Sequence, residues 1–228
     1  MTAGADAAAE AYAEARSLLA EPAMAAVGTH GFTILYGPPI QRPDLFLISF
    51  QGGGAAPVVY ERWPERFRYL DNEHKPGNAF KFGRNLCVYS RQAGLYDVLA
   101  TSTVAVPAVF PCGPGDFANC WLKGSGAYAR WRRFSVEWVA RMVDAFEPKA
   151  VLVFGKKAAE ALGLSAQWRD VEVNPNNNFM TFGRARYGRT EAIFCGHLSQ
   201  GYVGSAVVRS LRVAADVAGE AGSSPEPR

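Results

Sequence analysis

Three short runs of apolar residues are the feature that most constrains how this chain can fold. They lie at residues 44–50, 150–154 and 191–195. Such runs are typical of strands buried on both faces, as the strands of a parallel sheet are when helices cover both sides. Helical patterns lie between them, and the clearest is the apolar stripe of residues 135–146. Strands that alternate with helices predict an α/β fold built as a three-layer α/β/α sandwich.

The remaining segments complete this expected organisation. We expect helices over 5–20, 78–94, 156–162 and 202–218, with Gly94 as a helix cap. Short strands or extended segments are expected over 32–36 and 116–122, a strand broken by Pro107 within 96–110, and a hairpin within 170–195 that turns at Tyr187 and Gly188. The predicted domains are an N-terminal helical extension (1–30), one α/β domain (31–218) and a disordered polar tail (219–228).

The composition is that of a globular protein. The chain has 228 residues, of which 49% are hydrophobic and 20% charged, so one large domain with a sizeable core is expected. The formal net charge is only +3, so an anionic partner would have to meet a local basic patch. Arginines cluster in 62–68, 130–133 and 184–189, where solvated surface is the commoner explanation and a nucleic-acid footprint the rarer one.

Cysteine usage and the length of the apolar runs indicate a cytoplasmic protein. The four cysteines form no Cys-x-x-Cys pair and have no histidine at zinc spacing, so we expect no metal and no cofactor. Cys87, Cys120 and Cys195 lie in apolar runs and are expected to be buried thiols. The alanine-rich, acidic N-terminus predicts a helix rather than a signal peptide, and no apolar run approaches membrane-spanning length.

Unusual residues follow or interrupt four of the predicted strands. Gln51 and the glycines of 52–54 follow the first, Asn119 lies inside the second, Gly155 ends the third and His197 follows the fourth. If these strands are parallel, the four positions gather along one edge of the sheet. Ligands of open α/β sheets bind at the carboxyl edge. A neutral histidine at that edge can donate a hydrogen bond to charge that develops on a substrate.

This placement resembles the uracil-DNA glycosylase superfamily. Residues 197–199 (His-Leu-Ser) are similar to the His-Pro-Ser turn after the family's last strand and depart from it at Pro. Residues 49–53 (Ser-Phe-Gln-Gly-Gly) keep the position and closing glycine of the family's first motif but lack its first Gly and its Pro. Residues 116–119 (Asp-Phe-Ala-Asn) resemble the strand whose asparagine reads the pyrimidine edge, and 151–158 resemble the family's strand-Gly-helix step.

The resemblance implies both a fold and an activity. The fold is a central four-stranded parallel sheet between helices, with a pocket at the strand ends that receives a base flipped out of DNA. The activity is hydrolysis of the N-glycosidic bond of uracil or a modified base, as in base-excision DNA repair. The implied partner is single- or double-stranded DNA, bound by a monomer without a membrane or a cofactor.

The chemistry assigns an expected role to each position. His197 would stabilise the negative charge of the leaving base, and Gln51 would hold the attacking water. Asn119 would read the Watson–Crick edge, because an amide offers both a donor and an acceptor. The other expected contacts are to the base and sugar (Phe50, Gly52, Gly53, Phe80 and Ser199) and to the DNA (Gln200, Tyr202 and Lys156).

Alternatives stay open at this point. Gln51 stands where the family usually has Asp or Asn and cannot supply a carboxylate, so the same fold could bind nucleic acid or a nucleotide without cleaving it. An α/β hydrolase is a poorer alternative, because its Gly-x-Ser-x-Gly elbow would need Gly where His197 stands. His197 and Asn119 could also be buried polar residues whose hydrogen bonds are satisfied by neighbouring groups.

Overall fold

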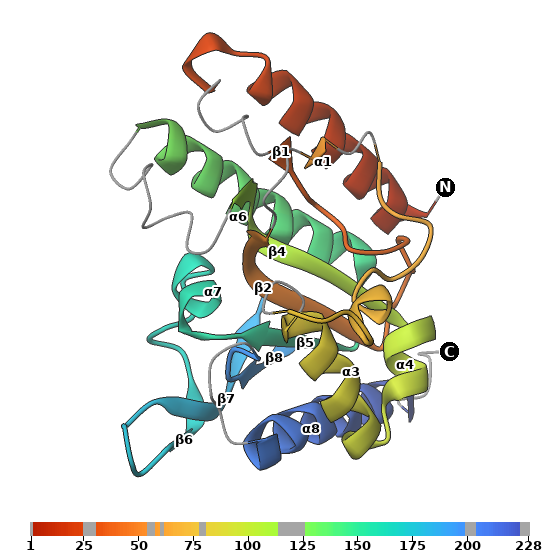
Figure 1. The fold of residues 1–228 in the computed structure, drawn as a ribbon, viewed down its shortest axis with the longest axis vertical. Helices are drawn as coiled ribbons and strands as arrows, with labels where there is room; N and C mark the ends of the chain where they lie inside the picture. Colours follow the sequence, from red (N-terminus) through yellow and green to blue (C-terminus); the bar gives the residue numbers. More distant parts are fainter. Residues whose placement is uncertain are drawn as a thin grey trace.

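The computed structural model describes residues 2–24, 31–53, 58–59, 62–77, 81–113, 126–198 and 204–223. Within these residues the chain has a mixed α/β fold, in which eight strands form a sheet in the order β3-β1-β4-β2-β5-β8-β7-β6 (Figure 1). The strands are β1 (Gly31–Phe32), β2 (Leu45–Gly53), β3 (Val58–Val59), β4 (Thr103–Gly113), β5 (Ala150–Phe154), β6 (Arg169–Val173), β7 (Met180–Tyr187) and β8 (Thr190–Cys195).

Four neighbouring strands at the centre of the sheet, β4, β2, β5 and β8, are parallel to one another. Leu45 pairs with both Thr103 and Ala150, and Ala150 pairs with Glu191, so the four strands begin in register. Every residue of β5 is buried, which explains why this run is apolar throughout. The strands predicted from the three apolar runs are therefore confirmed, and their carboxyl ends share one edge.

The sheet is wider than the four strands expected from the sequence. On one side of the central strands, β1 pairs antiparallel with β4, and β3 pairs parallel with β1. On the other side, β7 pairs antiparallel with β8, and β6 pairs antiparallel with β7. Of the strand or extended segment expected over 32–36, only the start belongs to a strand, since β1 covers Gly31–Phe32; the N–H groups of Thr33 and Tyr36 still donate to carbonyls of β4. Of these outer strands, β1 and β3 have two residues each, β6 is largely exposed, and β7 carries polar residues between apolar ones, so none has the continuous apolar run that marks a strand buried on both faces.

Pro107 does not break its strand, contrary to expectation. β4 continues from Thr103 through Pro107 to Gly113, and Pro107 pairs with Ser49 of β2. The carbonyl of Ala105 points away from β2, where it accepts a 2.9 Å hydrogen bond from the N–H of Tyr36. Pro107 lies two residues further and has the same orientation, so its missing N–H falls on the side of the irregular 33–36 segment. The ladder to β2 therefore loses no donor.

The helices cover both faces of the sheet (Figure 1). Helices α1 (Ala3–Leu19), α6 (Gly126–Phe146) and α7 (Lys156–Ala161) contribute to the apolar core on one face. Helices α3 (Lys81–Ala93), α4 (Tyr96–Thr101) and α8 (Gly204–Ser223) contribute to the core on the other. Two short 3-10 turns, η1 (Pro22–Met24) and η2 (Leu70–Asn72), complete the described elements.

Several boundaries differ from the prediction. The segment that opens the expected 96–110 strand is helix α4, and the helix expected over 135–146 begins earlier, at Gly126. Helix α8 continues to Ser223, past the expected start of a disordered tail at 219. Helix α1 packs closely on the domain, because Tyr12 is buried and its hydroxyl accepts a hydrogen bond from the N–H of Leu35.

Two predicted chain reversals are confirmed. Gly94 follows α3 with φ +77°, and the N–H of Leu95 closes the helix end on the carbonyl of Ser90 at 2.7 Å. The hairpin between β7 and β8 turns at Gly188, which has φ +59°. Among the described helices, none combines the length and apolar character that a membrane span requires.

Candidate functional site at the carboxyl edge of the sheet

The parallel register brings three of the predicted strand-end positions to one edge. Gln51 lies near the end of β2, Gly155 directly follows β5, and His197 lies two residues after β8. The predicted 116–122 strand with Asn119 falls outside the described residues. The same holds for four further predicted contacts: Phe80, Ser199, Gln200 and Tyr202.

Gly155 allows His197 to approach the end of β5 closely. Its backbone has φ +85° and ψ 158°, and its N–H donates a 2.8 Å hydrogen bond to the carbonyl of Cys195. A Cβ atom placed on Gly155 would lie only 3.0 Å from the Cβ of His197. The backbone conformation therefore favours glycine here, and any larger residue would also force His197 to move by a few tenths of an ångström.

The surroundings of His197 favour its neutral form. The side chain is half-buried, and the ring of Phe82 lies 5.4 Å from the imidazole, centroid to centroid. Burial lowers the pKa of His197, and the positive charge of Lys157 lowers it further. The imidazole is then neutral near pH 7 and carries one ring N–H as a donor. Helix α3 supports the following turn, since the amide of Asn85 donates to the carbonyl of Leu198 at 2.6 Å.

The end of β2 contributes the second part of the site. Its ladder with β4 shifts register between Gln51 and Gly52, and such a bulge changes the direction of the side chains beside it. Gln51 is partly buried, and its side-chain oxygen is inaccessible to solvent. The Nζ atom of Lys157 lies 5.9 Å from the centre of the Phe50 ring. Lys157 is therefore close to the Phe50 ring, and its positive charge also acts on His197.

Sequence reasoning missed two residues that the fold places here. One is Phe82, whose ring contacts His197. The other is Lys157, whose charge acts on His197. Its neighbour Lys156 is exposed and pairs with Glu160 at 3.6 Å. Phe80 itself falls outside the described residues, and the DNA contact expected of Lys156 stays a prediction. Neighbouring positions on a helix point in different directions, and only packing decides which one meets the site.

A row of aromatic rings extends from His197, and of its members Tyr69 is buried while Phe82 and Tyr36 are partly buried. Phe82 lies 5.2 Å from Tyr69, and Tyr69 stacks on Tyr36 at 4.8 Å, centroid to centroid. Burial raises the pKa of Tyr69 to about 12, against the lowering effect of hydrogen bonding with the hydroxyls of Ser49 and Tyr36. These tyrosines stay protonated at neutral pH and bring polar groups close to an otherwise apolar wall.

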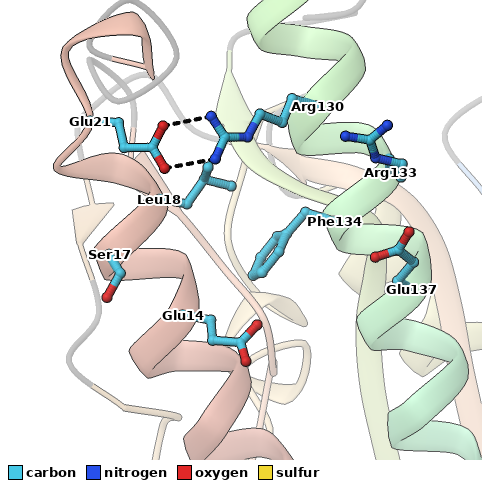
Figure 2. A pocket seen from close by; sticks show the side chains of 8 residues that line it. All are labelled: Glu14, Ser17, Leu18, Glu21, Arg130, Arg133, Phe134 and Glu137. Carbon is cyan, nitrogen blue, oxygen red and sulfur yellow. Dashed lines mark hydrogen bonds and ion pairs between the residues drawn. The ribbon is translucent and has the colours of Figure 1, made fainter.

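A separate hollow of about 330 Å³ lies between α1 and α6 (Figure 2). Glu21 and Arg130 close one part of it with hydrogen bonds of 2.5 and 2.7 Å, and the ring of Phe134 points into it. Its lining contains none of the predicted site residues. In the described part of the chain, no group of three or more His, Cys, Asp or Glu side chains is placed to bind a metal ion. The strand-end cluster is therefore the stronger candidate.

Comparison with known proteins adds no assignment. No protein-family model matches the sequence, and no curated protein matches it.

Proposed function

We propose that this protein is a DNA glycosylase of the uracil-DNA glycosylase-like type. It hydrolyses the N-glycosidic bond of a uracil or modified base that is flipped out of DNA. The observation that carries the proposal is the environment of His197. A half-buried imidazole with a lowered pKa lies at the carboxyl edge of four parallel strands, close to Lys157, which also approaches Phe50.

This environment suits the chemistry of base release. The bond from C1′ of the sugar to the base nitrogen breaks with its electron pair going to the base, so the sugar becomes cationic and the base anionic. The neutral His197 donates a hydrogen bond to a carbonyl oxygen of the departing base, where the negative charge collects. The half-buried setting strengthens this bond, because partial exclusion of water reduces screening.

Lys157 contributes to the same step. Its positive charge lowers the pKa of His197 because it disfavours a second positive charge nearby. The same potential favours the negative charge of the departing base. Lys157 is exposed, so solvent and salt screen this contribution and keep it modest.

Gln51 completes the proposed reaction on the sugar side. A water molecule held by its amide attacks C1′, the water oxygen forms the new bond, and a water proton is released to solvent or to the base. Because an amide cannot offset the positive sugar as a carboxylate would, we expect slower turnover than an Asp at this position would support. Phe50 is the proposed stacking partner of the flipped base, which aromatic side chains stabilise by contact with its π face.

The decisive experiment measures abasic-site formation. Purified protein is incubated with single- and double-stranded oligonucleotides that contain uracil, and abasic sites are revealed by alkaline cleavage. We expect cleavage with the wild type and its loss in His197→Ala. His74→Ala is the matched control, because His74 is exposed. Equal turnover in the His197→Ala and His74→Ala variants would refute the role given to His197.

A binding protein on the same fold is the alternative, and Gln51 favours it by offering no carboxylate. It predicts salt-dependent binding to nucleic acid without abasic product. Well-folded protein that binds the oligonucleotides and releases no uracil or other tested base would replace the glycosylase proposal with this one.

A further inference from the structure

The β6–β7 hairpin holds most of the large exposed apolar side chains among the described residues. Of the four large hydrophobic residues exposed among the described residues, three lie in it: Val171 (48% exposed), Val173 (51%) and Phe179 (60%). The fourth, Val88, lies on α3. A single exposed hydrophobic residue needs no explanation, but a group within one short hairpin indicates a surface that contacts a partner.

The tip of this hairpin, residues 174–179, lies at the same edge of the sheet as the candidate site, the edge where β8 ends. Phe182 of β7 pairs antiparallel with Cys195, the last residue of β8. Because the two strands run in opposite directions, His197, which follows Cys195, and Phe179, which precedes Phe182, both lie beyond this pair at the carboxyl edge of β8. Three extended residues span about 10 Å, so Phe179 extends roughly that far beyond the pair. The hairpin projects from the body of the protein in Figure 1.

Local hydrogen bonds hold the tip in a defined shape. The N–H of Asn174 donates to the carbonyl of Phe179, and the N–H of Asn178 donates to the carbonyl of Asn174, both at 2.8 Å. The N–H of Phe179 donates to the side-chain oxygen of Asn177 at 3.1 Å. The exposed ring is thus presented by an ordered turn, which reduces the conformational entropy lost when it binds a partner.

The charges around this edge suit a polyanion. Helices α7 and α8 place basic residues there, namely Lys156, Lys157 and Arg209. Glu160 pairs with Lys156 and Glu172 pairs with Arg209, which leaves this group with more positive than negative charge. Such an excess at the rim of a site attracts the phosphate backbone of a nucleic acid.

The edge strand itself is poorly shaped for pairing with another strand. The β6–β7 ladder shifts register on both sides of Glu172, and Asp170 has φ +51°. A bulged edge does not present the regular row of N–H and C=O groups that strand addition requires. The apolar tip therefore fits stacked bases better than a second copy of β6.

We propose that the β6–β7 hairpin is a second DNA contact, in which Phe179 stacks against or inserts beside a base near the flipped nucleotide. The proposal rests on the proposed function in taking DNA as the ligand. Apolar side chains that insert between bases unstack them and stabilise a distorted duplex. Phe179 would thereby favour the open duplex from which a base is extruded, and it touches neither the sugar nor the base that reacts.

Fluorescence anisotropy tests the contact with a labelled duplex that carries one uracil opposite guanine. The full chain is compared with Phe179→Ala, with Phe179→Trp, and with Val88→Ala as the control for loss of an exposed apolar side chain. We expect Phe179→Ala to weaken binding about tenfold. Phe179→Trp and Val88→Ala should remain close to the wild type. A 2-aminopurine base beside the uracil should brighten with the wild type and less with Phe179→Ala.

The outcomes separate this inference from the proposed function. Binding that weakens only in Phe179→Ala supports the hairpin contact even if no base is released, a result that would refute the glycosylase alone. Equal affinity of the Phe179→Ala and Val88→Ala variants would overturn the hairpin contact even if uracil is excised. A wild type that binds no DNA would overturn both proposals. An oligomer that Phe179→Ala dissociates would assign the hairpin to self-association instead.

Discussion

Replacement of Gly155 by alanine tests the geometry on which the site depends. The glycine has φ +85° and ψ 158°, a conformation almost exclusive to glycine, and other residues pay about 1–3 kcal/mol to adopt it. The new Cβ would lie 3.0 Å from the Cβ of His197, and relief of such an overlap in a packed region costs about 1–3 kcal/mol more. We expect Gly155→Ala to reduce the free energy of unfolding by about 2–6 kcal/mol.

Gly163→Ala is the matched control for this prediction. Gly163 also has a positive φ, +72°, but a Cβ added there meets no atom within 4 Å. We expect it to cost only the backbone strain, about 1–2 kcal/mol. Urea unfolding followed by tryptophan fluorescence measures both variants. The difference between them combines the contact with His197 and any difference in backbone strain between the two positions.

A double-mutant cycle with His197→Gly identifies the partner in that contact. Removing the Cβ of His197 relieves the overlap, so Gly155→Ala should cost about 1–2 kcal/mol less in this background than in the wild type. Two results would refute the reasoning. One is a Gly155→Ala variant as stable as Gly163→Ala, and the other is a penalty that does not change when His197→Gly is present.

Three further predictions concern electrostatics. Lys157→Gln should raise the pKa of His197, because it removes a positive charge that now lowers this pKa. An NMR titration of the imidazole protons measures the change, and an unaltered pKa would contradict the electrostatic interaction between Lys157 and His197. Because the folded pKa of His197 is lowered, the unfolded chain binds the proton first, so the free energy of unfolding should fall as pH drops from about 6.5 towards that lowered pKa. His197→Ala should reduce the dependence of the free energy of unfolding on pH, as measured by urea unfolding across the same range. An unchanged dependence would contradict the lowered pKa of His197. Arg130→Ala should cost less than about 1 kcal/mol at low salt and still less at high salt, because its pair with Glu21 is substantially exposed; a larger loss would mean that the pair supports the α1–α6 packing.

Much of the fold could be predicted from local sequence. Apolar runs identify β2, β5 and β8, because a strand covered on both faces must be apolar along its length. Gly94 marks the end of α3, because the chain there needs a positive φ that glycine adopts without strain. The predicted break at Pro107 was wrong, because proline interrupts a strand only where its missing N–H would have bonded to a neighbouring strand.

The candidate site, too, could be predicted only in part from the sequence. The sequence by itself determined which strands are buried and that Gln51, Gly155 and His197 follow them. That these residues share one edge depends on the parallel pairing of the strands, which the structure shows. Only the tertiary structure decided that Phe82 contacts His197, that Lys157 approaches Phe50, and that the tip with Phe179 lies at the same edge. Local sequence fixes the direction of the chain within an element through short-range sterics and apolar periodicity. The choice of neighbouring side chain depends on packing between elements that are distant in sequence, and no local pattern encodes that packing.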